Sequence, residues 1–151
     1  MKRISILGST GSIGTQTIDV IASRPGEFRV VALAAGRNVS RLEEQALALR
    51  PELVVVSDEG QARVLASRLP RATCVAFGRH GLVEAARHPE AELVVCGLVG
   101  AVGIEPAYAA VDAGKDAKGS GGDAGSHGVS GPCQAPPQRT FGWGKTARRH
   151  R

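Results

Sequence analysis

Cysteine and histidine are few in this chain, and their spacing excludes the sites that these residues most often build. The three cysteines, Cys74, Cys96 and Cys133, contain no Cys-x-x-Cys pair. Their odd number and irregular spacing indicate neither a disulfide framework nor a zinc site. The four histidines have no ligand-like spacing to the cysteines, so we predict no metal site. Cys74 and Cys96 stand in apolar runs and are expected to be buried small hydrophobic residues.

Long apolar runs are also missing, and this bears on location. No stretch reaches the ~20 apolar residues that a membrane-spanning helix needs. The chain begins with Met1, Lys2 and Arg3 and continues directly into a β-type run, without an apolar signal region or an amphipathic transit segment. We therefore expect a cytoplasmic protein of bacterial type with no membrane partner.

Acidic residues are scarce in the last part of the chain, and this accounts for the net charge of +5. Residues 1–116 contain equal numbers of basic and acidic residues, whereas six basic residues and one acid follow. A neutral folded surface does not favour nucleic acid as a partner. The basic residues of this last part are Lys118, Arg139, Lys145, Arg148, Arg149 and Arg151, and the acid is Asp123.

Up to residue 116, short apolar runs of β type alternate with stretches of helical periodicity. This alternation is typical of an α/β fold, and we predict a Rossmann-like, doubly wound, mostly parallel sheet. Near-continuous apolar strands must be covered on both faces, and the helices supply that cover. In the second predicted helix, Leu42, Gln45, Ala46 and Leu49 share one face. The predicted strands are 4–7, 28–34, 53–56, 73–77 and 93–96, and the predicted helices are 14–23, 40–49, 62–69, 81–87 and 106–112.

The composition changes after Asp116. Residues 117–151 contain eight glycines and three prolines, with few large apolar residues and no period of two or 3.6. Such a stretch cannot bury enough apolar surface to offset the ordering of its backbone. We therefore predict a folded domain over residues 1–116 and a disordered tail, rich in Gly and Arg, over residues 117–151.

The most informative segment is residues 4–14, with the sequence ISILGSTGSIG. It joins a buried strand to a helix through three glycines at G-x-x-G-x-x-G spacing, a variant of the dinucleotide-binding fingerprint. Gly8 would form the tight turn, Gly11 would leave the backbone bare for a pyrophosphate, and Gly14 would let the helix pack against the strand. Amides at the helix start would face the phosphates. A plain tight turn is the alternative.

The end of the second predicted strand indicates which dinucleotide binds. Domains that prefer NAD place an Asp or Glu there to hold the ribose hydroxyls, but here the next acid after the strand is Glu43. Arg37 would instead pair with a 2′-phosphate through charge-assisted hydrogen bonds, which favours NADPH. The alternative is that Arg37 is a solvated loop residue and Asn38 only the N-cap of the next helix.

A second glycine-rich loop, residues 97–103, follows the last predicted strand at the carboxyl edge of the sheet, where α/β folds bind ligands. Two interpretations stay open. The loop passes beneath the nicotinamide ring, or it is a flexible connection between a strand and a helix.

Four blocks of the sequence together resemble the amino-terminal domain of the 1-deoxy-D-xylulose 5-phosphate reductoisomerase family, in order and in spacing. The resemblance covers about residues 1–116. It implies an NADPH-dependent enzyme that also needs a divalent metal, Mg or Mn, and is a homodimer. Its substrate is a phosphorylated sugar, 1-deoxy-D-xylulose 5-phosphate, which it rearranges and reduces to 2-C-methyl-D-erythritol 4-phosphate in non-mevalonate isoprenoid biosynthesis. The blocks are residues 6–14 (ILGSTGSIG), 29–39 (RVVALAAGRNV), 99–103 (VGAVG) and 113–115 (AGK).

The resemblance also assigns residues to the cofactor. It implies that two segments of the domain hold the NADPH. Thr10, Gly11, Ser12 and Ile13 would line the phosphates, and Gly36, Arg37 and Asn38 would hold the adenosine 2′-phosphate end.

The resemblance ends after residue 116. The family continues there into a buried strand and an Ala-Asn-Lys-Glu segment, whereas residues 117–122 of this chain read AKGSGG. The family's Asp-Ser-Glu metal ligands, catalytic flap and carboxyl-terminal helical domain have no counterpart. We therefore assign no catalytic and no metal-binding residue, and we expect the chain to be inactive alone.

One hypothesis explains this abrupt end as a shift of reading frame near codon 116. A nucleotide sequence in which neither alternative frame encodes an Asn-Lys-Glu segment would contradict it. Two other functions stay open. One is a fragment of another NADP-dependent Rossmann oxidoreductase, such as a semialdehyde dehydrogenase type, which the missing active-site cysteine motif disfavours. The other is a non-catalytic module that binds a cofactor, or binds nucleic acid through the basic tail.

Overall fold

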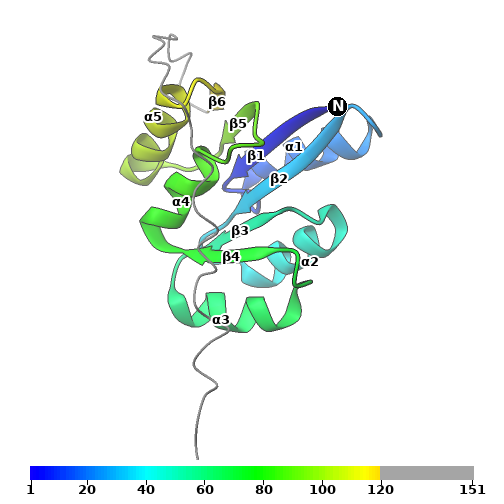
Figure 1. Ribbon diagram of the computed structural model, residues 1–151, viewed down its shortest axis with the longest axis vertical. Helices are drawn as coiled ribbons and strands as arrows, with labels where there is room; N and C mark the ends of the chain where they lie inside the picture. Colours follow the sequence, from blue (N-terminus) through cyan, green and yellow to red (C-terminus); the bar gives the residue numbers. More distant parts are fainter. Residues whose placement is uncertain (120–151) are drawn as a thin grey trace, which may run out of the picture.

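The computed structural model describes residues 1–119, in which strands and helices alternate along the chain (Figure 1). This confirms the α/β fold predicted from the sequence. The strands are β1 (Lys2–Leu7), β2 (Phe28–Ala34), β3 (Leu53–Val56), β4 (Cys74–Phe77), β5 (Leu93–Cys96) and β6 (Asp116–Gly119). The helices are α1 (Ser12–Ala22), α2 (Val39–Leu49), α3 (Glu59–Arg68), α4 (Gly78–Ala86) and α5 (Ile104–Asp112), with a short 3-10 turn η1 (Gly100–Gly103) before α5.

The strands form one parallel sheet in the order β4-β3-β2-β1-β5-β6. From β1 the chain builds outward to β4, and it then crosses to the other side of β1 to add β5 and β6. The strand order therefore reverses between β1 and β5. In doubly wound folds, ligands bind outside the carboxyl ends of the strands at this switch point.

Helices cover both faces of the sheet, as the continuous apolar strands require (Figure 1). One core lies under α1, α2 and α3, and the other lies under α4 and α5. Successive strand side chains point to opposite faces, so Val54 packs into the first core and Val55 into the second. The first core includes Ile6, Ile21, Leu42, Val54 and Leu65, and the second includes Leu7, Val55, Ala85, Val94 and Ala110.

Strand β6 differs from the sequence-based prediction. The predicted tail began at Ala117, but residues 116–119 pair with β5 in parallel register, from Leu93 opposite Asp116 to Cys96 opposite Gly119. This pairing uses backbone hydrogen bonds, which need no apolar periodicity, and half-buried Ala117 packs against the second core. Periodicity therefore could not find this strand. The predicted disorder of the remaining tail concerns residues 120–151, which lie outside the described part of the chain.

The two cysteines within residues 1–119 differ in burial. Cys96 is buried in the second core, as predicted. The prediction for Cys74 was wrong, because it is the first residue of the edge strand β4 and its thiol is exposed. Cys133 lies outside the described residues.

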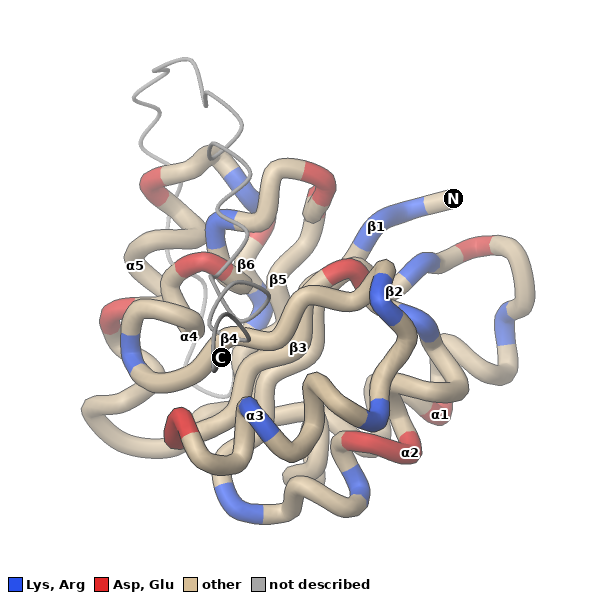
Figure 2. Tube along the Cα trace, turned by 60° about the horizontal axis from the view of Figure 1, so that its bottom comes forward, with Lys and Arg blue, Asp and Glu red and all other residues tan. Residues whose placement is uncertain are grey.

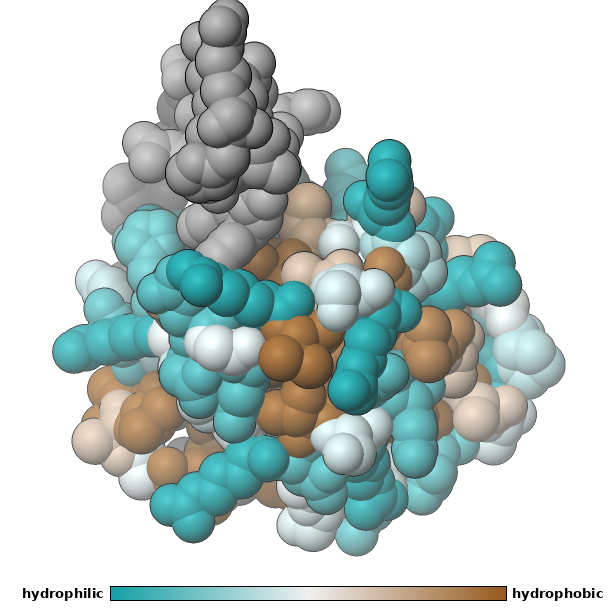
Figure 3. All heavy atoms as spheres, turned by 90° about the horizontal axis from the view of Figure 1, so that it is seen from below, coloured by the Kyte–Doolittle hydropathy of each residue, from teal (hydrophilic) through white to brown (hydrophobic). Residues whose placement is uncertain are grey.

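Charges of both signs are distributed along the trace of residues 1–119 (Figure 2). Hydrophobic surface shows in patches between hydrophilic side chains on the face seen in Figure 3. Within residues 1–119, no helix combines the length and the apolar character needed to cross a bilayer.

Candidate cofactor-binding site

Two glycine loops meet at the switch point between β1 and β5. Gly8 follows β1 with a φ of +82°, and a Cβ there would lie 2.9 Å from the carbonyl carbon of Gly97. Gly97 follows β5, and its amide donates to the carbonyl oxygen of Leu7 at 2.7 Å. The left-handed φ and the close approach both require glycine at position 8, which agrees with the tight turn predicted there.

Gly14 brings the helix α1 against the loop. A Cβ at this position would lie 2.3 Å from the carbonyl oxygen of Gly8 and 2.4 Å from the Cα of Ser9. The prediction had Gly14 packing on the strand, whereas its nearest neighbours are atoms of the turn that follows the strand. The glycine therefore lets the first turn of the helix sit directly on the loop.

The amino terminus of α1 is open. Its N-cap, Gly11, has no side chain to accept a hydrogen bond. Amides in the first turn of a helix have no partner within the helix, and in residues 1–119 the amides of Ser12, Ile13 and Gly14 have no backbone carbonyl as acceptor. Exposed amides at the positive end of a helix dipole are suited to bind a phosphate.

The loop is fixed to the neighbouring strand β2. The amides of Gly8 and Ser9 both donate to the carbonyl oxygen of Ala34, at 2.7 and 2.9 Å. On the side of α2, the Nε2 of Gln45 donates to the carbonyl oxygen of Ser9 at 3.0 Å. Gln45 was not among the site residues predicted from the sequence. The available signal was a polar residue on the apolar face of a helix.

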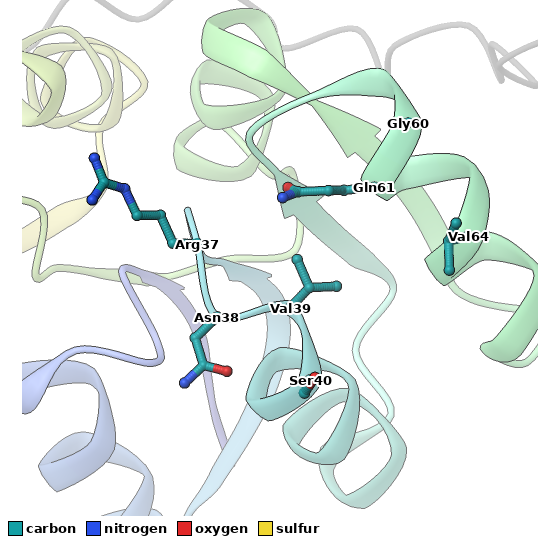
Figure 4. A pocket seen from close by; sticks show the side chains of 7 residues that line it. All are labelled: Arg37, Asn38, Val39, Ser40, Gly60, Gln61 and Val64. Carbon is teal, nitrogen blue, oxygen red and sulfur yellow. The ribbon is translucent and has the colours of Figure 1, made fainter.

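The residues after β2 lie beside this loop. Gly36, Arg37 and Asn38 are exposed at the carboxyl edge of the sheet. Arg37 extends from the rim of an open cavity of about 450 Å³, away from Gln61 on the far wall (Figure 4). Within residues 1–119, no carboxylate forms an ion pair with Arg37, so its guanidinium is available to an anion.

Asn38 is the N-cap of α2, which was one of the two interpretations of this residue. Its Oδ1 accepts a hydrogen bond from the backbone amide of Arg41 at 3.1 Å, which caps α2. The side-chain nitrogen of Asn38 is not used in this cap, so the same residue can still donate to a ligand.

A second cavity, of about 460 Å³, connects the end of β2 to the loop after β5. Gly36 stands on one side, and Ser57 donates from its Oγ to the Gly36 carbonyl oxygen at 2.8 Å. Ala101 and Val102 of η1 contribute apolar surface on the other side. The loop of residues 97–103 therefore forms a wall of a cavity that begins where the cofactor residues of β2 end.

Ion pairs concentrate at the opposite edge of the sheet. Arg3 pairs with Glu90 and with Glu92 near the amino-terminal ends of β1 and β5. The backbone amide and the guanidinium of Arg3 hold the pKa of the Glu92 carboxyl below its usual value. These contacts hold β1 beside the segment before β5. At the carboxyl edge, Arg79 pairs with Glu105 beside the second cavity, and Arg37 forms no ion pair within residues 1–119.

The described residues do not fit a divalent metal. No three His, Cys, Asp or Glu side chains in residues 1–119 lie close enough together to hold a metal ion. A carboxylate cluster is the usual protein contribution to a Mg or Mn site.

The fold and the glycine loops agree with comparisons to known proteins. The model of the 1-deoxy-D-xylulose 5-phosphate reductoisomerase family matches residues 4–118. The chain belongs to this family. The resemblance identified from the sequence is thereby confirmed.

Reductoisomerases from distant organisms are similar to this chain. The enzyme of Symbiobacterium thermophilum is 56% identical over 120 residues, which cover 76% of this chain and 31% of the relative. The chloroplastic enzyme of Mentha piperita is 49% identical over 122 residues, covering 76% of this chain and 25% of the relative. The chain thus spans about a third or less of the length of these reductoisomerases.

Solved reductoisomerase structures share the fold. The enzyme of Zymomonas mobilis in complex with NADPH superimposes with a TM-score of 0.74 at 31% identity, over 79% of this chain and 31% of that one. A reductoisomerase in complex with NADPH, fosmidomycin and magnesium gives a TM-score of 0.73 at 32% identity, over 78% of this chain and 29% of that one.

Proposed function

We propose that residues 1–119 bind NADPH as the cofactor-binding part of a reductoisomerase. The open amino terminus of α1 at the switch point carries this proposal. It offers unpartnered amides and a positive dipole end where doubly wound folds bind dinucleotides. The NADPH complexes of the related reductoisomerases support it.

Two groups of residues would hold the phosphates of NADPH, one the diphosphate and the other the 2′-phosphate. The loop, with Gly8, Thr10, Gly11, Ser12, Ile13 and Gly14, would hold the diphosphate through backbone amides. The segment after β2, with Gly36, Arg37 and Asn38, would hold the adenosine 2′-phosphate. The second cavity has apolar surface and extends from Gly36 to η1, which suits the adenine ring.

Arg37 would determine the choice of cofactor. It is exposed and has no carboxylate partner in the described chain, so a 2′-phosphate would give it the charge-assisted hydrogen bonds that it lacks. NADH has a hydroxyl at that position and would gain much less from the guanidinium. We therefore assign this chain a preference for NADPH.

In a reductoisomerase of full length, this part would hold the cofactor for the reduction of 1-deoxy-D-xylulose 5-phosphate to 2-C-methyl-D-erythritol 4-phosphate. When bound, NADPH supplies the hydride of that reaction. The described residues hold the cofactor and offer no metal cluster, so the metal and the phosphorylated sugar would be bound by the two thirds of the relatives that this chain does not match. We propose that this chain alone binds the cofactor without turnover, in a cytoplasm of bacterial type, and we leave the family's homodimer as a prediction.

Titration calorimetry of the 151-residue chain with NADPH and NADH tests this proposal. We expect NADPH to bind at least about tenfold more tightly than NADH, and Arg37→Ala to remove that difference. Arg71→Ala is the matched control, because Arg71 is also exposed but lies between α3 and β4, before the amino end of a strand. Failure of the wild-type chain to bind either cofactor, or equal binding of both, would overturn the proposal.

A further inference from the structure

The side chain of Gln45 connects α2 to the glycine loop after β1. Its Nε2 donates to the carbonyl oxygen of Ser9 at 3.0 Å, across a sequence separation of 36 residues. The neighbouring positions on the same helix face, Leu42 and Ala46, are buried apolar residues of the first core. A single polar side chain on this face therefore reaches the loop that faces the proposed cofactor.

Ser9 and Gln45 each bury a polar atom that has no hydrogen-bond partner within residues 1–119. Ser9 is fully buried, and its Oγ has no hydrogen-bond partner within residues 1–119. The Oε1 of Gln45 is likewise buried and unpartnered in the same part of the chain. A buried polar atom without a partner destabilises the fold, so an apolar residue of similar size at position 45 would pack better. What Gln45 adds, compared with such an apolar residue, is its hydrogen bond to the Ser9 carbonyl oxygen.

The direction of the Ser9 carbonyl determines the direction in which the Thr10 amide points. In a trans peptide unit the C=O and the N–H point in opposite directions, and the described chain has no cis peptide bond. Because Gln45 holds the Ser9 carbonyl toward α2, the amide of Thr10 points away from α2. This amide donates to no backbone carbonyl within residues 1–119.

The rest of the loop is fixed by other means. The amides of Gly8 and Ser9 are held by Ala34, and Gly14 packs against the Ser9 Cα. Gly14 also lies against the Ser9 carbonyl carbon, and the Gly11 amide donates to the Gly8 carbonyl oxygen at 3.2 Å, which closes a turn around Ser9 and Thr10. Within residues 1–119, the bond from Gln45 is the one hydrogen bond that the Ser9 carbonyl oxygen accepts, so Gln45 contributes to the orientation of the peptide unit between Ser9 and Thr10.

We propose that Gln45 is a positioning residue that aims the Thr10 amide at the cofactor diphosphate. The proposal rests on the proposed NADPH binding. Gln45 touches only the far side of the Ser9–Thr10 peptide unit and acts on the cofactor through Thr10. Without this bond, the peptide unit is held less firmly and the charge-assisted hydrogen bond to the diphosphate is weakened.

The test uses the 151-residue chain and two ligands. NADPH carries both the 2′-phosphate and the diphosphate, whereas adenosine 2′-monophosphate carries no diphosphate. NMR titration of the amide-labelled chain gives both affinities and the shift of the Thr10 amide. We expect Gln45→Met to bind NADPH about tenfold more weakly, to lose the NADPH-induced shift at Thr10, and to bind adenosine 2′-monophosphate as the wild type does.

Two further variants support the comparison. Gln16→Met makes the same chemical change at an exposed position of α1 and should behave as the wild type. Gln45→Leu also removes the donor and adds no charge, so it gives the same answer if Gln45→Met does not fold.

Each result decides between the two proposals. Unchanged NADPH binding in the Gln45 variants, with normal binding in the wild type, would overturn the role of Gln45 alone. Equal weakening of both ligands would also overturn it, because that result indicates general damage to the fold. If the wild-type chain binds no NADPH, the proposed function fails and the role of Gln45 fails with it.

Discussion

Gly14 faces Gly8 so closely that a Cβ at position 14 would lie 2.3 Å from the Gly8 carbonyl oxygen. The atoms that such a Cβ would meet are backbone atoms of Gly8 and Ser9, so they cannot move aside without displacing the loop or the helix. This one relationship joins the turn that leaves β1 to the helix that offers its amides.

Replacing Gly14 by Ala should therefore damage both stability and binding. We expect Gly14→Ala to lower the free energy of unfolding by about 1–3 kcal/mol through overpacking, and to abolish NADPH binding. Urea unfolding and calorimetry measure the two effects. Gly26→Ala is the control, since a Cβ there meets nothing within 4 Å although its φ is +85°. It should cost about 1–2 kcal/mol and leave binding unchanged, and a similar loss of binding in both variants would contradict the argument.

The two roles of Asn38 can be separated by two substitutions. Asn38→Ala removes the N-cap of α2, and we expect a loss of about 1 kcal/mol in the free energy of unfolding. Asn38→Asp keeps an oxygen to accept from the Arg41 amide, but it places a negative charge beside the proposed 2′-phosphate. It should keep the stability and weaken NADPH at least about tenfold more than NADH. NADPH affinity equal to the wild type in Asn38→Asp would remove Asn38 from the cofactor site.

His88 makes the stability depend on pH. Its side chain is 11% exposed, and burial lowers its pKa, although Glu52 and Glu90 oppose the shift; Lys115 adds to it. The folded protein therefore binds this proton less readily than the unfolded chain. The unfolded pKa is about 6.5, so stability is complete above it and declines as the pH falls below it. Urea unfolding at several pH values should show this decline, and His88→Gln should reduce it. The control His80→Gln, at an exposed position, should leave it unchanged.

Strand β6 should contribute to stability. A chain that ends at Lys115 leaves the edge of β5 unpaired and removes the packing of Ala117 on the second core. We expect its thermal midpoint to lie about 4–8 °C below that of a chain that ends at Gly119. The shorter chain should also associate more readily through the open edge, as light scattering would show. Equal midpoints would mean that residues 116–119 add no stabilising contact.

The sequence predicted the buried strands well and the helix starts less well. The bounds of β2, β3 and β5 agree with the prediction, because each is an apolar run that only Arg29 in β2 interrupts. The helix α3 begins at Glu59 rather than residue 62, because its first turn is fixed by the Asp58 side chain accepting from the Gln61 amide and not by apolar spacing. Asp58, a residue type that favours the N-cap position, was a signal in the sequence for this earlier helix start.

In the candidate site, the glycine loops were predictable because their spacing reflects backbone geometry. The bond from Gln45 to Ser9 was not, since it joins residues that only the packing of α2 beside β1 and β2 brings together. Strand β6 escaped prediction for a similar reason. Its pairing depends on a partner strand and not on its own composition.

The double acceptor role of the Ala34 carbonyl has a consequence for the size of the ligand. It holds the glycine loop at the very end of the strand whose next residues lead to Arg37. In the proposed complex, the separation between the glycine loop and the backbone of Arg37 is therefore set by two adjacent strands. Substitutions that leave this backbone in place can change how tightly a nucleotide is held. They do not change the separation of the two segments that the nucleotide must span.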